Sequence, residues 1–203
     1  TLNTQRMRER VRAAFEKRGA RVLPRLLLLT EVDRLLPLPP PAPIAPLRRR
    51  LDLARLLEGL LQTGTTDFSR AALFDLAESL ATLMAEMQGE GVGPDRIAAL
   101  DVAEHSGHWA RMQAFLGIVG QALAEDAPDA EGRLRGVVTE LALGWQTAPP
   151  ADPVIVAGST GSRGTTAILL QAVARLPKGA VVLPGFDFDL PQPVWDGMAD
   201  ALT

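Results

Sequence analysis

Hydrophobic residues recur with helical spacing through residues 47–147, which predicts four amphipathic helices. The first stripe follows the i, i+3, i+4, i+7, i+8 pattern of one buried helix face. It consists of Leu53, Leu56, Leu57, Leu60 and Leu61. The other three stripes fall within 73–87, 109–123 and 134–145, and Ser69 is a suitable N-cap for the second. Helices with one apolar face must pack against one another or against a neighbouring layer.

The two ends of the chain show a different pattern, in which short continuous apolar runs alternate with helical ones. Residues 153–158 (PVIVAG) and 180–185 (AVVLPG) predict strands on either side of a helix over 165–177. Near the start, residues 4–19 predict a helix closed by Gly19. The run RLLLL (25–29) predicts a strand, and Thr30 is a suitable N-cap for a following helical turn. A strand–helix–strand unit implies a parallel crossover.

A proline-rich segment separates the first α/β part from the helical part. Six of the residues 37–46 are proline, which can continue neither a helix nor a central strand. A stiff linker at a boundary is favoured over a ligand for an SH3-type domain. We therefore predict one parallel α/β domain formed by residues 1–45 and 148–203, with a helical insertion subdomain at 46–147.

The composition is that of an ordinary globular protein with an uneven charge distribution. No apolar run approaches the length of a membrane span, no secretory signal is visible, and the 203 residues include no cysteine. These features predict a cytoplasmic protein with no membrane partner, no disulfide and no thiolate metal site. Because the chain starts at Thr1 and ends in an amphipathic stretch, we expect it to be a piece of a longer protein.

Most of the basic residues lie near the start. Residues 1–50 contain 12 of the 21 Lys and Arg but 4 of the 24 Asp and Glu, so their net charge is +8 against −11 for the rest. Arg6, Arg8, Arg10 and Arg12 alternate along the first predicted helix, so only some of them can face one ligand. Three further cations stand at the start of a helix, where they oppose its macrodipole. They are Arg48, Arg49 and Arg50. An anionic polymer and a solvated basic face are both compatible with this pattern.

A glycine-rich loop between a predicted strand and a predicted helix has the outline of a phosphate-binding loop. A working loop of this kind is G-x-x-x-x-G-K-[ST], in which the lysine reaches the outer phosphates. Here the place of the lysine is taken by Gly164, and an arginine precedes it. The loop therefore predicts a degenerate nucleotide or anion site at the helix N-terminus. Its residues are Gly158, Ser159, Thr160, Gly161, Ser162 and Arg163.

Other reactive residues do not form a recognisable constellation. His105 and His108 stand three residues apart, but no third zinc ligand has a suitable spacing. Asp187 and Asp189 could face a divalent ion, yet a solvated loop fits them better. The nucleophile motif G-x-S-x-G is absent. We predict no catalytic residue and no metal site.

Several stretches together resemble AddB, a subunit of the AddAB helicase–nuclease that repairs double-strand breaks. They include TLNTQRMRERVRAAF (1–15), EHSGHWARMQAFLGIV (104–119) and AGSTGSRGTTAILLQAVARLPKGAVVLPGFDFDLP (157–191). The resemblance covers essentially the whole chain and implies a P-loop-NTPase-like, superfamily 1 helicase-like α/β domain carrying a helical insertion. It also implies AddA and single- and double-stranded DNA as partners. No cofactor is expected here, although the parent protein would use ATP and Mg²⁺ and carry an iron–sulfur cluster.

The resemblance further assigns roles to individual residues. It implies that Thr4 and Arg6 contact DNA phosphates, and we add Arg8 and Arg48 to Arg50 on grounds of charge. The strand at 153–157 matches the one that carries the Walker B acid of a motor, but Ala157 and Gly158 stand at its end. We therefore expect a non-catalytic segment that binds and scans DNA during end resection. The alternatives are an ATPase using the loop 158–165 and a structural module that docks the partner motor subunit.

Overall fold

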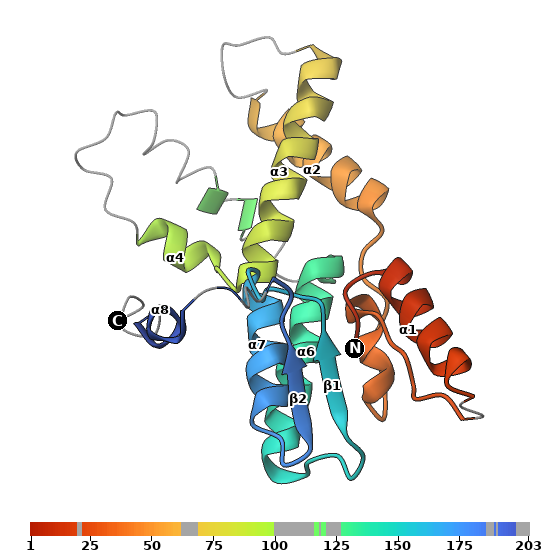
Figure 1. The fold of residues 1–203 in the computed structure, drawn as a ribbon. Coiled ribbons are helices and arrows are strands. Elements are labelled where there is room, and N and C mark those ends of the chain that lie inside the picture. The colour runs from red at the N-terminus through yellow and green to blue at the C-terminus, as the bar shows by residue number, and fades with distance from the viewer. Residues whose placement is uncertain are drawn as a thin grey trace.

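The computed structural model describes residues 1–19, 22–61, 69–99, 116–117, 119–120, 127–185, 189 and 191–197. These residues are mainly helical, with a parallel sheet of two strands (Figure 1). Their elements, in chain order, are α1 (Gln5–Lys17), the 3-10 helix η1 (Leu29–Leu35), α2 (Pro46–Leu61), α3 (Arg70–Glu90), α4 (Pro94–Ala98), α6 (Ala130–Thr147), β1 (Val154–Ala157), α7 (Gly164–Ala174), β2 (Gly179–Val182) and α8 (Gln192–Gly197).

The predicted strand–helix–strand unit is confirmed. β1 pairs in parallel with β2, from Val154 opposite Gly179 to Ala157 opposite Val182, and α7 connects them. Leu2 forms a parallel bridge with Ala157 on one side and with Leu28 on the other. The parallel arrangement therefore continues as β2, β1, Leu2, Leu28. The predicted strand over 25–29 is reduced to that single bridging residue.

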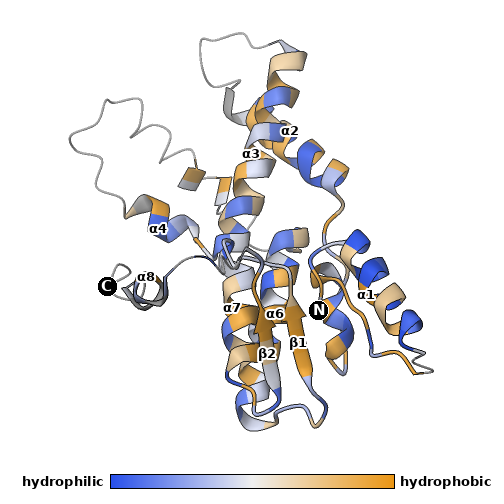
Figure 2. Ribbon diagram, viewed as in Figure 1, coloured by the Kyte–Doolittle hydropathy of each residue, from blue (hydrophilic) through white to orange (hydrophobic). Residues whose placement is uncertain are grey.

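One hydrophobic core lies behind the sheet. Leu169 and Val173 of α7 pack with Val137 and Val138 of α6, and Val156 projects into the same cluster from β1. α7 packs against both strands, and α6 packs against α7 and η1. Figure 2 shows that β1 consists of hydrophobic residues. On the face of the strands opposite this core, about half of Ile155 and of Val182 is exposed. We refer to η1, α6, α7, β1 and β2 as the α/β body.

A second core lies between α2 and α3. Leu53 and Leu57 of α2 are fully buried against Ala77 and Leu80 of α3, with Val119 completing the cluster. This cluster has no member in common with the core of the α/β body. In Figure 1, α2 and the N-terminal part of α3 project away from the sheet, whereas the C-terminal end of α3 meets α6 and α7. We call α2 and the part of α3 that packs on it the helical arm.

Several helix ends were predicted correctly. Ser69 caps α3 by accepting a hydrogen bond from the Ala72 amide at 3.2 Å, and Gly91 ends the helix with a φ of +70°. Gly19 follows α1 with a φ of +72°. The prediction for Thr30 is wrong: η1 begins one residue earlier, at Leu29. The reason is that the Glu31 carboxylate reaches back and accepts from the Leu28 amide at 3.0 Å.

The proline segment is fastened to α6 by one arginine. Arg133 donates from Nε to the Pro41 carbonyl at 2.8 Å and from Nη2 to the Pro40 carbonyl at 3.1 Å. Its Nη2 also lies 2.9 Å from Oδ2 of Asp33. Three acceptors on one planar fork fix the segment where it leaves the α/β body. Among the helices described, none is long and apolar enough to cross a membrane.

Candidate functional site

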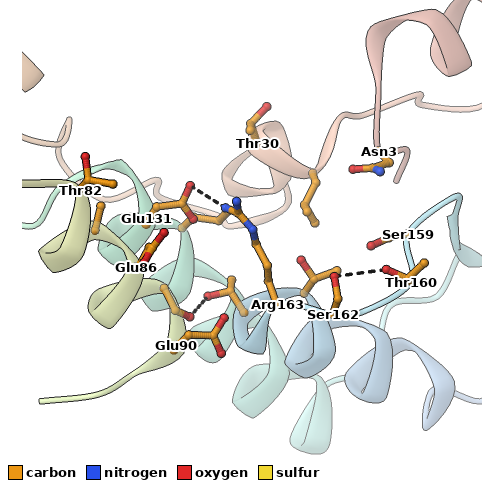
Figure 3. Close-up of a pocket in the computed structure, with 16 residues that line it drawn as sticks. Asn3, Thr30, Thr82, Glu86, Glu90, Glu131, Ser159, Thr160, Ser162 and Arg163 are labelled. Atoms are coloured by element: carbon orange, nitrogen blue, oxygen red, sulfur yellow. Dashed lines mark hydrogen bonds and ion pairs between the residues drawn. The ribbon is translucent and has the colours of Figure 1, made fainter. Parts of the chain in front are cut away.

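A cavity of about 740 Å³ opens at the carboxyl ends of the parallel segments. This edge is where open parallel sheets place their ligand crevices, because loops and helix N-termini gather there. The walls come from the N-terminal segment, α3, α6 and the loop before α7, as Figure 3 shows. The polar side chains of the wall are Asn3, Thr30, Thr82, Glu86, Glu90, Glu131, Ser159, Thr160, Ser162, Arg163, Thr165 and Thr166.

The loop that follows β1 is folded by its own glycines and hydroxyls. Gly158 and Gly161 have φ values of +83° and +71°, a region that favours glycine. A side chain at Gly158 would also collide with Met7, since its Cβ would lie 2.5 Å from the Met7 sulfur. Asn3 donates to the Gly158 carbonyl at 3.2 Å, and Ser159 accepts from the Gly161 amide at 3.3 Å. The two glycines are therefore required by the shape of the turn.

The N-terminus of α7 holds a carboxylate from another helix. Both oxygens of Glu90, the last residue of α3, lie 3.0 Å from the amide nitrogen of Gly164. A negative group at a helix N-terminus completes an unsatisfied donor and interacts well with the macrodipole, which is worth about 0.3–1 kcal/mol. The anion predicted for this loop is thus supplied by the chain itself.

The two residues of α3 that precede Glu90 also bond to the α/β body. The carbonyl of Gly89 accepts from the Thr165 hydroxyl at 2.7 Å and from Nη1 of Arg135 at 2.8 Å. Thr165 is 3% exposed, so its hydroxyl is committed to this bond. Gln88 accepts from the Asp129 amide, at the start of α6, at 3.3 Å. Residues 88, 89 and 90 therefore each bond to the α/β body.

The charges around the cavity disfavour a phosphate ligand. Glu86, Glu90 and Glu131 line it, and Arg163 lies 3.7 Å from Oε1 of Glu131. A nucleotide would face these carboxylates and would find the first α7 amide already occupied. Among the described residues, no group of three or more His, Asp or Glu side chains is arranged to hold a metal ion.

The residues predicted to contact DNA fall into different environments. Thr4 caps α1 by accepting from the Met7 amide at 3.2 Å, and Arg6 is exposed just after it. Arg8 instead points to Glu31, with its Nη1 2.7 Å from Oε2. The Leu28 amide and the Arg8 guanidinium together hold the pKa of the Glu31 carboxyl below its usual range.

The three arginines at the start of α2 also differ from one another. Arg48 is mostly exposed and lies 3.6 Å from Asp52, one turn further along the helix. Arg50 lies 3.5 Å from Glu78 of α3. Arg49 is 5% exposed, and its Nη2 donates to the Ala127 carbonyl at 2.8 Å. The structure therefore brings only Arg48 and Arg50 to the surface.

A cationic stripe on α1 was not fully identified from the sequence. Arg6, Arg10 and Lys17 are exposed, and separations of four and eleven residues are close to whole helical turns. They therefore share one side of α1, whereas Arg8 faces the α/β body. We call Arg6, Arg10 and Lys17 the α1 stripe. Helical spacing applied to the charged residues alone would have found it.

Some of the other candidates lie outside the described residues. These are His105, His108 and Asp187, together with most of the third apolar stripe. Asp189 is described and exposed. Comparison of the chain with protein-family models, with curated proteins and with solved structures gives no match in any of the three.

Proposed function

We propose that this chain is a non-catalytic, helicase-like segment of an AddB-type subunit, which contacts the DNA backbone while a helicase–nuclease resects broken ends. AddA is the proposed motor partner, and ATP, Mg²⁺ and an iron–sulfur cluster are proposed for the parent complex only. The observation that carries the DNA contact is the α1 stripe. Three cations stand on one exposed face of a helix that begins at the carboxyl edge of the parallel segments.

The geometry of the stripe suits a phosphate backbone better than bases. Arg6 and Arg10 are one helical turn apart, and guanidinium groups bind phosphate oxygens in forked pairs. The stripe contains no aromatic side chain on which a base could stack. We therefore expect binding that depends strongly on salt and weakly on nucleotide sequence. Arg8 and Arg49 are left out of this surface because each already bonds inside the protein.

We propose that the chain has no catalytic activity because of the residues that line the cavity and follow β1. Glu90 bonds the first amide of α7, three glutamates line the walls, and β1 ends at Ala157 and Gly158 without an acidic residue. These features favour a scaffold over the alternative of an ATPase that uses residues 158–165. A structural module that docks the motor subunit without touching DNA is the other alternative, and it predicts no role for the α1 stripe.

The test is fluorescence anisotropy of a labelled single-stranded oligonucleotide titrated with the protein over a series of salt concentrations. Counterion release predicts that the logarithm of the binding constant falls linearly with the logarithm of the salt concentration. A random-sequence and a poly-pyrimidine oligonucleotide should bind alike. If neither binds at low salt, the DNA contact is refuted and the docking alternative is favoured.

A further inference from the structure

We infer that residues 88–90 of α3 form a latch that sets the orientation of the helical arm on the α/β body, with Glu90 acting as an intramolecular substitute for a bound anion. The latch connects the two cores, and its function does not depend on the proposed DNA contact.

The latch joins two units whose hydrophobic cores are separate. The arm is held together by the cluster around Leu53 and Leu57, and the body by the cluster around Leu169 and Val173. The C-terminal end of α3 reaches α6 and α7 between them. An apolar interface between two units resists rotation because any movement exposes hydrophobic area, whereas hydrogen bonds can be exchanged for bonds to water.

The bonds of the latch are polar and concentrated in three consecutive residues. Gln88 and Glu90 each accept from a backbone amide at the start of a helix of the body, Asp129 before α6 and Gly164 in α7. The carbonyl of Gly89, near the end of α3, accepts from Arg135 and Thr165. Each contact satisfies a helix terminus that lacks an intrahelical partner. The end of α3 thus acts as a cap for both body helices.

The position of the latch makes it releasable. Glu90 is exposed and lines the 740 Å³ cavity, so water can reach its bond to the Gly164 amide. In Figure 3 the Glu90 side chain lies at the edge of this cavity, on the side opposite Ser159 and Thr160. When the carboxylate leaves Gly164, only the bonds of Gln88 and Gly89 remain in the latch, so the arm is held less tightly.

A glycine allows the latch to be opened from the other side. A methyl group on Gly164 would lie 2.6 Å from Oε2 of Glu90, so Gly164→Ala displaces the flexible carboxylate. Alanine is at least as good as glycine in a helix, so α7 itself is not weakened. Glu90→Ala and Gly164→Ala should therefore both break the bond between these residues, the first by removing the carboxylate and the second by displacing it.

The experiment measures the arm–body distance by double electron–electron resonance in the whole chain. Spin labels are attached to two introduced cysteines, Glu58→Cys in the arm and Ala174→Cys on α7, both at exposed positions. Because the sequence has no cysteine of its own, no other site is labelled. Without further changes, one narrow distance distribution is expected. Glu90→Ala and Gly164→Ala should each add a second population or broaden the first.

The matched control is Glu86→Ala, which removes a carboxylate from the same cavity one turn earlier on α3. Circular dichroism restricts the comparison to folded variants, and Gly164→Ala keeps the test decisive if Glu90→Ala does not fold. The latch is supported if the control keeps the narrow distribution while the latch variants lose it. It is overturned if the folded latch variants keep that distribution, or if the control changes as much as they do.

Discussion

Glu90 and Gly164 are 74 residues apart in the sequence, yet both carboxylate oxygens of Glu90 lie 3.0 Å from the Gly164 amide nitrogen. The pair connects the end of α3 to the start of α7, at the position where a phosphate-binding loop presents its amides to a ligand. Because this amide is occupied and glutamates line the cavity, the glycine-rich loop is poorly suited to bind a phosphate group.

The first prediction concerns nucleotide binding. Isothermal titration calorimetry with ATP and Mg²⁺ should detect no saturable binding in the micromolar range, because Glu90 occupies Gly164 and the cavity carries three carboxylates. Arg163→Ala should change nothing, since Arg163 is mostly exposed and its ion pair with Glu131 is long, at 3.7 Å. Micromolar affinity that disappears in this variant would instead support the ATPase alternative.

A second prediction follows from the lowered pKa of Glu31. A carboxyl whose pKa falls on folding stabilises the protein while it is ionised, and this contribution is lost as the pH falls through the lowered pKa. Urea denaturation should therefore find Glu31→Gln less stable than the native chain at neutral pH. The difference should shrink below the usual value of 4.5 and vanish once the native carboxyl is protonated.

The comparison for Glu31 is Arg34→Gln, which removes a partner 3.7 Å away that is mostly exposed. Its effect should be smaller than that of Arg8→Gln, which removes the bond of 2.7 Å. An equal loss in both variants would mean that the Arg8 contact stabilises the Glu31 carboxylate no more than the distant Arg34 does.

A third prediction concerns the proline segment. Arg133→Ala removes hydrogen bonds to Pro40, Pro41 and Asp33 from a largely buried guanidinium, and should lower the free energy of unfolding by about 1–2 kcal/mol. Arg133→Lys keeps the charge but cannot reproduce the fork, so it should recover only part of this loss. Full recovery by lysine would show that charge alone holds the segment.

The separate cores give a fourth prediction. Leu57→Ala and Leu169→Ala each leave a cavity in one cluster, and each should lower the stability of the surrounding helices by about 2–5 kcal/mol. Hydrogen exchange should report the effect of Leu57→Ala mainly in α2 and α3, and that of Leu169→Ala mainly in α6 and α7. Equal protection losses in both regions for either variant would show that the two cores unfold as one.

Local patterns predicted the elements better than their partners. The spacing of Leu53 and Leu57, the cap at Ser69 and the strand–helix–strand unit after 153 were visible because they depend on neighbouring residues. The packing of α6 on α7 could not be assigned, since its apolar stripe fits any apolar surface. The P-loop-like fold class stays a prediction, as do the boundaries at 45 and 148.

The candidate site shows the same limit more sharply. Its glycine-rich loop and its missing lysine were apparent in the sequence. Glu90, which bonds to that loop, carries no local signal because it is simply the last acidic residue of an amphipathic helix. Arg48, Arg49 and Arg50 are consecutive, yet only Arg49 is buried. A basic run cannot reveal which of its members turns inward, because that depends on a contact with Ala127, 78 residues away.

The measurement that tests the account most directly compares two triple variants that remove equal charge. The first changes Arg6, Arg10 and Lys17 to glutamine, and the second changes the exposed Arg55, Arg70 and Arg175. With each lost phosphate contact worth about 0.7 in the salt slope for single-stranded DNA, the first variant should flatten the slope by about 2. The second variant should have the same salt slope as the native chain. Equal losses in both variants would contradict a DNA contact at the α1 stripe and leave only a general effect of net charge.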